Sequence, residues 1–258
     1  MAGRIFVVVG AKGGTGREIV RALAALPADT VAEVRAVVRD PATVTAEHAL
    51  APHLVDDRVT LVAGDCTQSE TLAAPFAGAH VVFFAAAGKG YANARAVDQV
   101  GLGATGVAAK EAGVARVVAV TAQLVHPSNR FNLIRGILNT INTGLFHKRG
   151  MMDMKYEGEQ LLRGSGADYT IVRPGQLGDG TDEATGEVVA AQCNGSLQRG
   201  GKLTRAATAA VCVAAAMSPL TKNVCFEVSG NSGAAFQGGE ALPRLFEGLI
   251  PAGEEGGL

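Results

Sequence analysis

Strand-type and helix-type patterns alternate along the first half of the chain. Residues 5–9 form an unbroken run of β-branched and other apolar residues, which is typical of a strand buried on both faces. A glycine-rich stretch follows. Residues 17–26 then carry four aliphatic side chains at helical spacing, and Pro27 closes this pattern. The chain is therefore predicted to begin as a strand, a tight turn and a helix.

The alternation continues to residue 121. Further strands are predicted over 34–38, 59–62, 81–86 and 117–121, and a helix of small residues over 101–112. Because parallel neighbours need crossover connections, strands that alternate with helices predict an α/β fold with a doubly wound parallel sheet. We expect one domain over residues 1–258, in which residues from about 176 to 258 form a small C-terminal lobe.

One window of the chain differs in composition from the rest. The chain has 45 alanines, but the 44 residues from Gln123 to Gly166 contain none. Six aliphatic residues recur there at helical spacing, namely Leu133, Ile134, Ile137, Leu138, Ile141 and Leu145. Two interpretations remain open: an ordinary packed helix, or a lid or partner surface. In the second case residues 129–150 contact a protein partner or another copy of the chain.

Composition and charge exclude several classes of protein. The chain is 48% hydrophobic and 18% charged, which favours a large core over disorder. Its 23 Lys and Arg balance 24 Asp and Glu, so we expect no nucleic-acid partner. The uncharged stretch over 206–217 is shorter than the roughly 20 residues that span a bilayer, and no signal peptide is expected at the N-terminus.

The cysteines indicate neither a metal site nor a disulfide framework. Cys66, Cys193, Cys212 and Cys225 lie far apart without a CxxC pair, which is typical of a reducing compartment. We therefore expect a cytoplasmic protein without a metal, or one in an organelle stroma if a transit peptide was removed.

A glycine-rich turn follows the first predicted strand directly. Gly10, Gly13 and Gly16 have GxxGxxG spacing: one glycine makes the turn, one lets the backbone approach a pyrophosphate, and one lets the helix pack on the strand. The pyrophosphate would meet free N–H groups at the helix N-terminus. The predicted dinucleotide-binding residues of this loop are Gly10, Lys12, Gly13, Gly14, Thr15 and Gly16.

The end of the second strand bears on the choice of dinucleotide. Arg39 stands there, and an arginine pairs with a 2′-phosphate through charge-assisted hydrogen bonds. Arg39 therefore favours NADP over NAD as the cofactor. Asp40 complicates this interpretation, because an acidic residue at that point would bind the 2′-hydroxyl of NAD instead.

Segments spread over almost the whole chain resemble the atypical short-chain dehydrogenase/reductases, in the branch of NmrA-like and biliverdin/flavin reductase-like proteins. The matching segments are 9–17 (VGAKGGTGR), 36–41 (AVVRDP), 64–66 (GDC), 85–88 (AAAG), 113–118 (GVARVV) and 165–175 (SGADYTIVRPG). The last is the most specific of them. This resemblance implies a Rossmann-type fold that binds NAD(P).

The resemblance also implies positions around the cofactor. Asp65 and Cys66 would lie beside the adenine. Ala85, Ala86 and Ala87 would form a floor of small residues under the adenosine ribose. The nicotinamide end would be formed by Thr121 with Pro174, Gly175, Gln176 and Leu177.

The chain departs from the family in its catalytic residues. The wider family uses a Tyr-x-x-x-Lys pair, in which tyrosine is the general acid and lysine holds the ribose. Lys155 matches the lysine, but Met151 stands four residues earlier, and Tyr156 would point about 100° away around the helix. Thr121 stands near the usual serine, and Tyr91 is a candidate substitute acid. Glu157 and Glu159, on the same helix, are interpreted as a solvated face.

Two classes of function remain open. The first is an NADP(H)-dependent oxidoreductase that passes hydride to a conjugated acceptor, such as a quinone, flavin or tetrapyrrole, without a tyrosine acid. Its catalytic candidates are Lys155, Thr121 and Tyr91, and its partner is a small-molecule substrate. The second is a catalytically inactive NADP-binding sensor or scaffold that acts through a protein partner.

Overall fold

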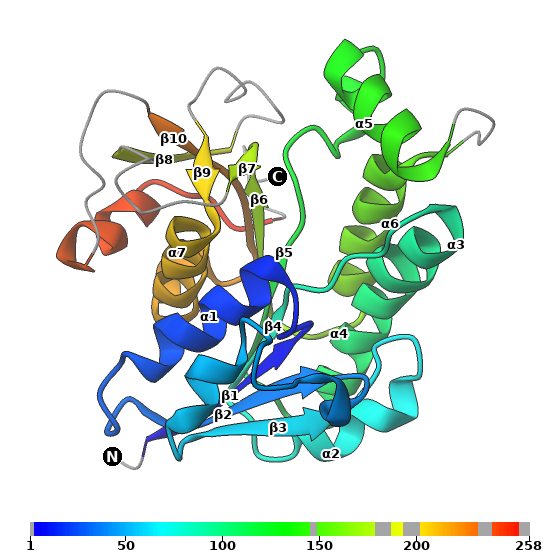
Figure 1. Cartoon of the computed structure of the whole chain (residues 1–258). Helices are drawn as coiled ribbons and strands as arrows, with labels where there is room; N and C mark the ends of the chain where they lie inside the picture. The colour runs from blue at the N-terminus through cyan, green and yellow to red at the C-terminus, as the bar shows by residue number, and fades with distance from the viewer. Residues whose placement is uncertain (1–2, 145–148, 179–186, 193–201, 232–238, 253–258) are drawn as a thin grey trace.

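The computed structural model describes residues 3–144, 149–178, 187–192, 202–231 and 239–252 (Figure 1). Its main sheet has eight strands, in the order β3 (Val59–Ala63), β2 (Val31–Val38), β1 (Arg4–Val9), β4 (Val81–Phe84), β5 (Arg116–Val120), β6 (Tyr169–Pro174), β10 (Val224–Asn231) and β8 (Glu187–Ala191). Neighbouring strands are parallel except for β8, which pairs antiparallel with β10. The predicted α/β fold with a doubly wound parallel sheet is confirmed.

Helices connect these strands. The α-helices are α1 (Gly14–Ala24), α2 (Ala73–Phe76), α3 (Tyr91–Asn93), α4 (Leu102–Glu111), α5 (Leu133–Thr143), α6 (Met151–Gly164) and α7 (Arg205–Met217), and a π-helix, η4 (Ala94–Gly101), joins α3 to α4. Short 3-10 turns are η1 (Pro41–Thr43), η2 (Ala51–Val55), η3 (Ser69–Leu72), η5 (Pro127–Asn129), η8 (Pro219–Thr221) and η9 (Gly239–Phe246). In the described part of the chain, no helix has the length and apolar character needed to cross a membrane.

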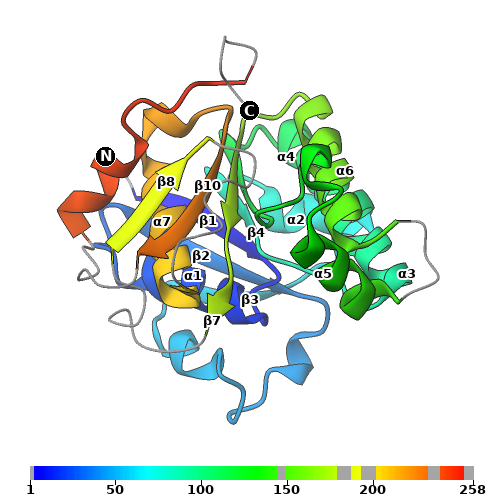
Figure 2. The same ribbon diagram turned by 90° about the horizontal axis from the view of Figure 1, so that it is seen from above.

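Each face of the sheet carries its own hydrophobic layer. Helices α1 and α7 cover one face, and α2, α4 and α6 cover the other (Figures 1 and 2). Strand β1 shows how the sequence supplies both layers. Phe6 and Val8 point to the α1 side, whereas Val7 and Val9 point to the α4 side. An uninterrupted apolar strand therefore fills two cores at once, because side chains alternate across the sheet.

The range 176–258 has two structural parts. Strands β10 and β8 extend the main sheet beyond β6, and α7 packs against α1. A second sheet of two short strands, β7 (Leu177–Gly178) and β9 (Leu203–Thr204), lies after the end of β6. The division into one domain with a small lobe over 176–258 stays a prediction.

Helix α5 forms in the alanine-free window, but most of its apolar side chains stay exposed. Leu133 and Ile141 are exposed, whereas Arg135 and Thr143 are buried. The interpretation of this segment as an ordinary packed helix is therefore wrong. Pattern alone identified the helix but not the face that the protein buries, because the inward polar side chains find partners in distant parts of the chain. Leu145, part of the same pattern, lies outside the described residues.

A buried ion pair joins α6 to the sheet. The Arg173 guanidinium of β6 donates to both carboxylate oxygens of Glu159, at 3.1 and 2.6 Å. Glu159 is fully buried, so the interpretation of that residue as part of a solvated face is wrong. Burial alone would lower the pKa of Arg173, but the adjacent carboxylate raises it, and the guanidinium stays charged.

We expect Glu159→Ala to destabilise the protein by about 3–5 kcal/mol, because it leaves the buried Arg173 charge without its carboxylate partner. Glu157→Ala on the same helix is the matched control. Its partner Arg149 is 61% exposed, so this change should cost less than about 1 kcal/mol. Urea unfolding of both variants measures the two values. Equal stability of the two variants would contradict the role given to the buried pair.

Candidate functional site

A cavity of about 750 Å³ opens at the carboxyl ends of strands β1 to β4. Ligands of doubly wound folds bind at this edge, and the volume suits a cofactor-sized molecule. The cavity brings together nine of the predicted cofactor-binding residues: Gly10, Lys12, Gly13, Arg39, Asp65, Cys66, Ala85, Ala86 and Ala87. Four segments predicted from separate motifs therefore meet at one site.

The turn after β1 lies directly against the end of β4. Gly10 has φ +81°, and a β-carbon there would lie 2.7 Å from the Ala86 Cα. A β-carbon on Gly16 would clash with the Gly10 carbonyl oxygen. Both glycines are therefore needed for the turn and for the packing of α1 on it, which are the roles expected of the first and third glycines.

Gly13 has a different environment. It is the N-cap of α1, with φ −73° and ψ 163°, an extended conformation open to any residue. A β-carbon there would lie 3.2 Å from the Gly10 oxygen and 3.8 Å from the Ala85 oxygen, close but without a severe clash. Gly13 is exposed and lines the cavity. Its lack of a side chain therefore keeps the helix N-terminus open to a ligand.

The two other loop residues predicted to bind the cofactor, Gly14 and Thr15, lie in the first turn of α1 and do not line the cavity. A β-carbon on Gly14 would lie 2.7 Å from Cδ and Nε of Arg205. Arg205, at the start of α7, thus packs on the glycine turn. Sequence patterns gave no function to this arginine, because the contact joins segments nearly 200 residues apart.

Two charged residues follow β2, namely Arg39 and Asp40, and the Asp40 carboxylate is hydrogen-bonded to the backbone. Arg39 is exposed and lines the cavity. The Asp40 carboxylate accepts a hydrogen bond from the Ala42 amide at 2.9 Å and caps η1. Nearby, the Lys12 ammonium donates to the Thr43 carbonyl at 2.8 Å. Two cations and the Asp40 carboxylate therefore share this corner, and the carboxylate accepts a hydrogen bond from the backbone of its own turn.

The end of β3, next to β2 in the sheet, also contributes to the cavity wall. One oxygen of the Asp65 carboxylate accepts hydrogen bonds from the amide and hydroxyl of Thr67, both at 2.9 Å. Cys66 is buried, and a β-carbon on Gly101 would lie 2.9 Å from its Sγ. Burial, and then the charge of Asp65, raise the pKa of the Cys66 thiol to about 12. The thiol is therefore protonated at neutral pH and acts as a small wall group.

Lys155 is linked to the cavity through a carboxylate that the sequence did not reveal. Its ammonium donates to Asp98 Oδ1 at 2.6 Å, and Asp98 Oδ2 accepts from the Gly88 amide at 2.8 Å. Gly88 lines the cavity, whereas Lys155 does not. Asp98 lies in the π-helix η4, and a β-carbon on Gly158 of α6 would clash with the Asp98 carbonyl. This close contact brings α6 and η4 together and holds the lysine beside the end of β4.

The residues predicted for the nicotinamide end lie outside the described cavity. Thr121 follows β5, and its hydroxyl donates to Glu159 at 2.6 Å, toward the α6 face of the sheet. The backbone at the end of β6 is ordered by neighbours: the Gln123 amide donates to the Pro174 carbonyl, and the Gly175 amide to the Val228 carbonyl, both at 2.9 Å. Gln176 and Leu177 lead into β7, where the Leu203 amide donates to the Gln176 carbonyl. The cofactor-binding roles of these residues stay predictions.

Two positions bear on whether the protein has a general acid in place of the family's tyrosine. Met151 is the first residue of α6, one turn before Lys155, and is buried. Tyr91 begins α3, between the cavity residues Lys89 and Asn93, but is not itself among the residues that line the cavity. Its role as a substitute acid stays a prediction.

Asp40, named above as the alternative to Arg39, also lines the cavity. Sequence patterns missed several further wall residues: Val9, Val37, Val38, Thr43, Gly64, Gly88, Lys89, Asn93 and Val97. Several of these residues are adjacent in sequence to a predicted residue, so the positions of the strand ends could have predicted them. Lys89, Asn93 and Val97 carry no such signal, because their position depends on how the helical segment from α3 through η4 crosses the cavity. Within the described residues, no group of three or more His, Cys, Asp or Glu side chains could hold a metal ion.

Solved structures share this fold across nearly the whole chain. A putative NAD-dependent epimerase/dehydratase from Bacillus halodurans has a TM-score of 0.68 at 22% identity, covering 95% of this chain and 99% of its own. The anaerobillin reductase ChuY from Escherichia coli O157:H7 has a TM-score of 0.66 at 23% identity, covering 88% and 98%. A Citrobacter triphenylmethane reductase complexed with NADP(H) has a TM-score of 0.56 at 19% identity, covering 86% and 68%.

Sequence comparison gives the family. Among curated proteins, none matches the chain significantly. The profile of the NAD(P)H-binding family matches residues 10–219, which include the glycine turn, the cavity and α6. This match confirms the resemblance to NAD(P)-binding reductase-like proteins that the motifs indicated. The chain belongs to the NAD(P)H-binding family.

Proposed function

We propose that this protein is an NADP(H)-dependent reductase that passes a hydride to a conjugated acceptor without a tyrosine general acid. The observation that carries the proposal is the buried Met151, one helical turn before Lys155, whose partner Asp98 accepts a hydrogen bond from Gly88 in the wall of the cavity. A thioether has no proton to donate. An acceptor that spreads the incoming charge over a conjugated system can take its proton from water instead.

The positions of the three tyrosines of the chain leave one candidate for a substitute acid. Tyr169 begins β6, at the edge of the sheet opposite the cavity, and packs against Arg163. Tyr156 makes an edge-on ring contact with His126, with centroids 5.5 Å apart. Tyr91 is therefore the one tyrosine whose place in the sequence adjoins cavity residues.

NADP is the proposed cofactor because the two charged residues after β2 have different partners. Asp40 caps its own turn, while the exposed Arg39 faces the cavity beside Lys12. A 2′-phosphate would find two cations at this corner, whereas Asp40, which also lines the cavity, already accepts a backbone hydrogen bond through one carboxylate oxygen. The Citrobacter reductase of the same fold is described as complexed with NADP(H).

Bound NADPH would supply the hydride. In this proposal the chain's own residues position the two reactants: the glycine turn and the α1 N-terminus hold the pyrophosphate, and Asp98 fixes Lys155 toward the cofactor ribose. Two proteins of the same fold are described as reductases of anaerobillin and of triphenylmethane compounds. Quinone, flavin and tetrapyrrole-like acceptors are the class to test.

The first test concerns the glycine turn. We expect Gly13→Val to remain folded, because its extended backbone suits a branched residue, and to lose nucleotide affinity by more than about 100-fold. Gly16→Ala is the contrasting variant. Its β-carbon meets the Gly10 carbonyl, so this change should lower the melting temperature. Calorimetric titration with NADPH and thermal unfolding separate the two effects. Unchanged NADPH affinity in folded Gly13→Val would remove the turn from the site.

The second test concerns the 2′-phosphate. Loss of a charge-assisted hydrogen bond costs about 1.5–3 kcal/mol, so Arg39→Ala should weaken NADPH binding by roughly 10- to 100-fold and leave NADH binding unchanged. Asp40→Asn keeps a capping side chain and is the control. It should alter neither affinity. Equal affinity of the parent protein for NADPH and NADH, or a large gain in NADPH affinity from Asp40→Asn, would contradict the assignment.

The third test concerns the missing acid. The parent protein should oxidise NADPH with quinones, flavins or tetrapyrrole-like acceptors and should not reduce simple ketones at any pH. If Tyr91 replaces the acid instead, ketone reduction should occur with a pH dependence that disappears in Tyr91→Phe. Steady-state NADPH oxidation across both panels decides between these outcomes. Robust ketone reduction that survives in Tyr91→Phe would show that the placement of Met151 is wrong.

A further inference from the structure

Helix α5 is amphipathic in the reverse sense to an ordinary surface helix. At about 100° per residue, positions 135, 139 and 143 share one face, and they hold Arg135, Asn139 and Thr143. This polar face turns toward the protein, and Arg135 and Thr143 are buried. The apolar residues of the same helix are left on the outside, where an isolated protein in water gains nothing from them.

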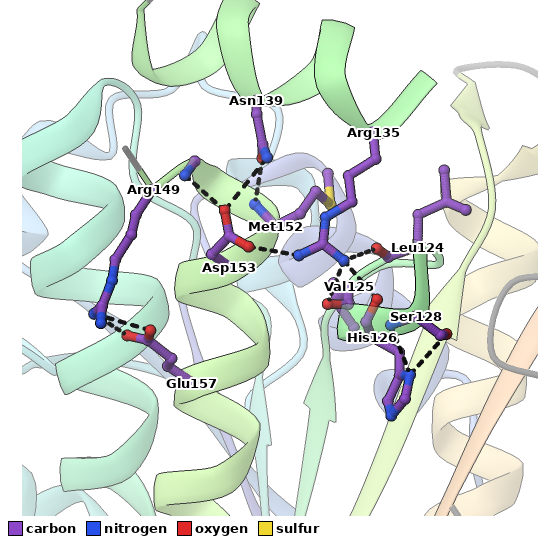
Figure 3. A network of polar contacts seen from close by, with 11 residues as sticks. Leu124, Val125, His126, Ser128, Arg135, Asn139, Arg149, Met152, Asp153 and Glu157 are labelled. Carbon is purple, nitrogen blue, oxygen red and sulfur yellow. Dashed lines mark hydrogen bonds and ion pairs between the residues drawn. The ribbon is translucent and has the colours of Figure 1, made fainter. Parts of the chain in front are cut away.

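Directed polar contacts fix this orientation (Figure 3). The Arg135 guanidinium donates to the carbonyls of Leu124 and Val125, at 2.8 and 2.9 Å, and to the Asp153 carboxylate at 2.5 Å. Asn139 accepts from the Met152 amide at 2.9 Å, at the start of α6. Rotation of α5 to bury its apolar face would leave the Arg135 charge and these carbonyls without partners, which is costly. The outward apolar face is therefore built into the fold.

The outward face is a concentrated patch. Ten large hydrophobic side chains are exposed in the described part of the chain, and five of them lie within residues 131–141. They are Phe131 (86% exposed), Leu133 (77%), Ile134 (53%), Ile137 (48%) and Ile141 (75%). Those within the helix span an arc of roughly 100°, as in helices that lie in a membrane interface. Such clustering marks an interaction surface rather than scattered surface residues.

The charge directly beside the patch is positive. The sequence from Ala112 to Met152 contains no Asp or Glu. Arg130 is exposed and stacks over the Phe131 ring at 4.7 Å, directly beside the patch. Arg149, which follows α5 in sequence, is 61% exposed but paired with Glu157. Apolar side chains that include an aromatic, next to an exposed arginine in a segment without acidic residues, complement an anionic lipid surface.

We propose that α5 is an interfacial anchor that seats the protein on an anionic membrane surface, with Phe131, Leu133, Ile134, Ile137 and Ile141 inserted among the lipids. A second copy of the chain is a poorer fit, because both copies would carry the positive charge of Arg130 beside the contact. In Figure 1, α5 projects beyond the end of α6 at which Met151 lies. A hydrophobic molecule dissolved in the bilayer would thus reach the protein at that end.

The test is co-sedimentation of the full chain with phosphatidylcholine vesicles that contain, or lack, about one third phosphatidylserine. The parent protein should bind the anionic vesicles, bind neutral ones at least fivefold less, and lose binding as salt is raised. Leu133→Asp/Ile141→Asp should reduce the partition coefficient at least tenfold. Val55→Asp/Leu220→Asp is the control, since it charges two exposed apolar residues outside the patch, in η2 and η8. It should bind like the parent.

Arg130→Gln gives an independent measure, with an expected loss of about fivefold on anionic vesicles alone. No sedimentation of the parent with anionic vesicles, or equal binding to neutral ones, would overturn the proposal. Light scattering supplies the remaining arm: a parent dimer that becomes monomeric in Leu133→Asp/Ile141→Asp would identify the face as an interface between copies. Lipid binding is read without turnover, so failure here is distinguishable from failure of the proposed reductase activity.

Discussion

The close contact between the turn after β1 and the end of β4 is the constraint on which the site depends. The Gly10 backbone lies so close to Ala86 that a β-carbon on Gly10 would clash with it, and Gly16 lets α1 pack against the same turn. No side chain fills this corner, so the cavity extends from the helix N-terminus to the ends of β2 and β3. The same glycines thus allow the helix and strands to pack closely and leave room for a ligand. A substitution that fills the corner would disturb both the packing and the cavity.

Asp98 extends this arrangement to the other side of the cavity. A buried carboxylate is tolerated when it is paired and hydrogen-bonded, and Asp98 meets both conditions through Lys155 and the Gly88 amide. The pair therefore ties α6 to the strand end that forms the cavity floor. The charge of Lys155 compensates the buried Asp98 carboxylate, whatever the lysine does for a ribose.

The sequence predicted the features that depend on local pattern. Apolar runs identified strands β1 to β5. The glycine spacing and the residues at the strand ends identified much of the cavity wall, because parallel strands bring their carboxyl ends to one edge of the sheet. Features that depend on long-range pairing were not predictable. Glu159 has the sequence pattern of a surface residue, but it is buried and paired with Arg173 of β6. Asp98 and Arg205 likewise gain their roles from segments far away in sequence.

Helix α5 shows the same limit from the opposite direction. Periodicity measures how apolar residues cluster around a helix, and a helix with a strong apolar face is ordinarily assigned to the core. Here Arg135 gains several backbone carbonyls and a carboxylate, which together outweigh the burial that the aliphatic face would provide. The polar face of α5 is turned inward because its hydrogen-bond partners lie there. The hydrophobic face is therefore left exposed and can contact a lipid surface. The energetic preference of one arginine therefore decides which side of the helix meets the surroundings.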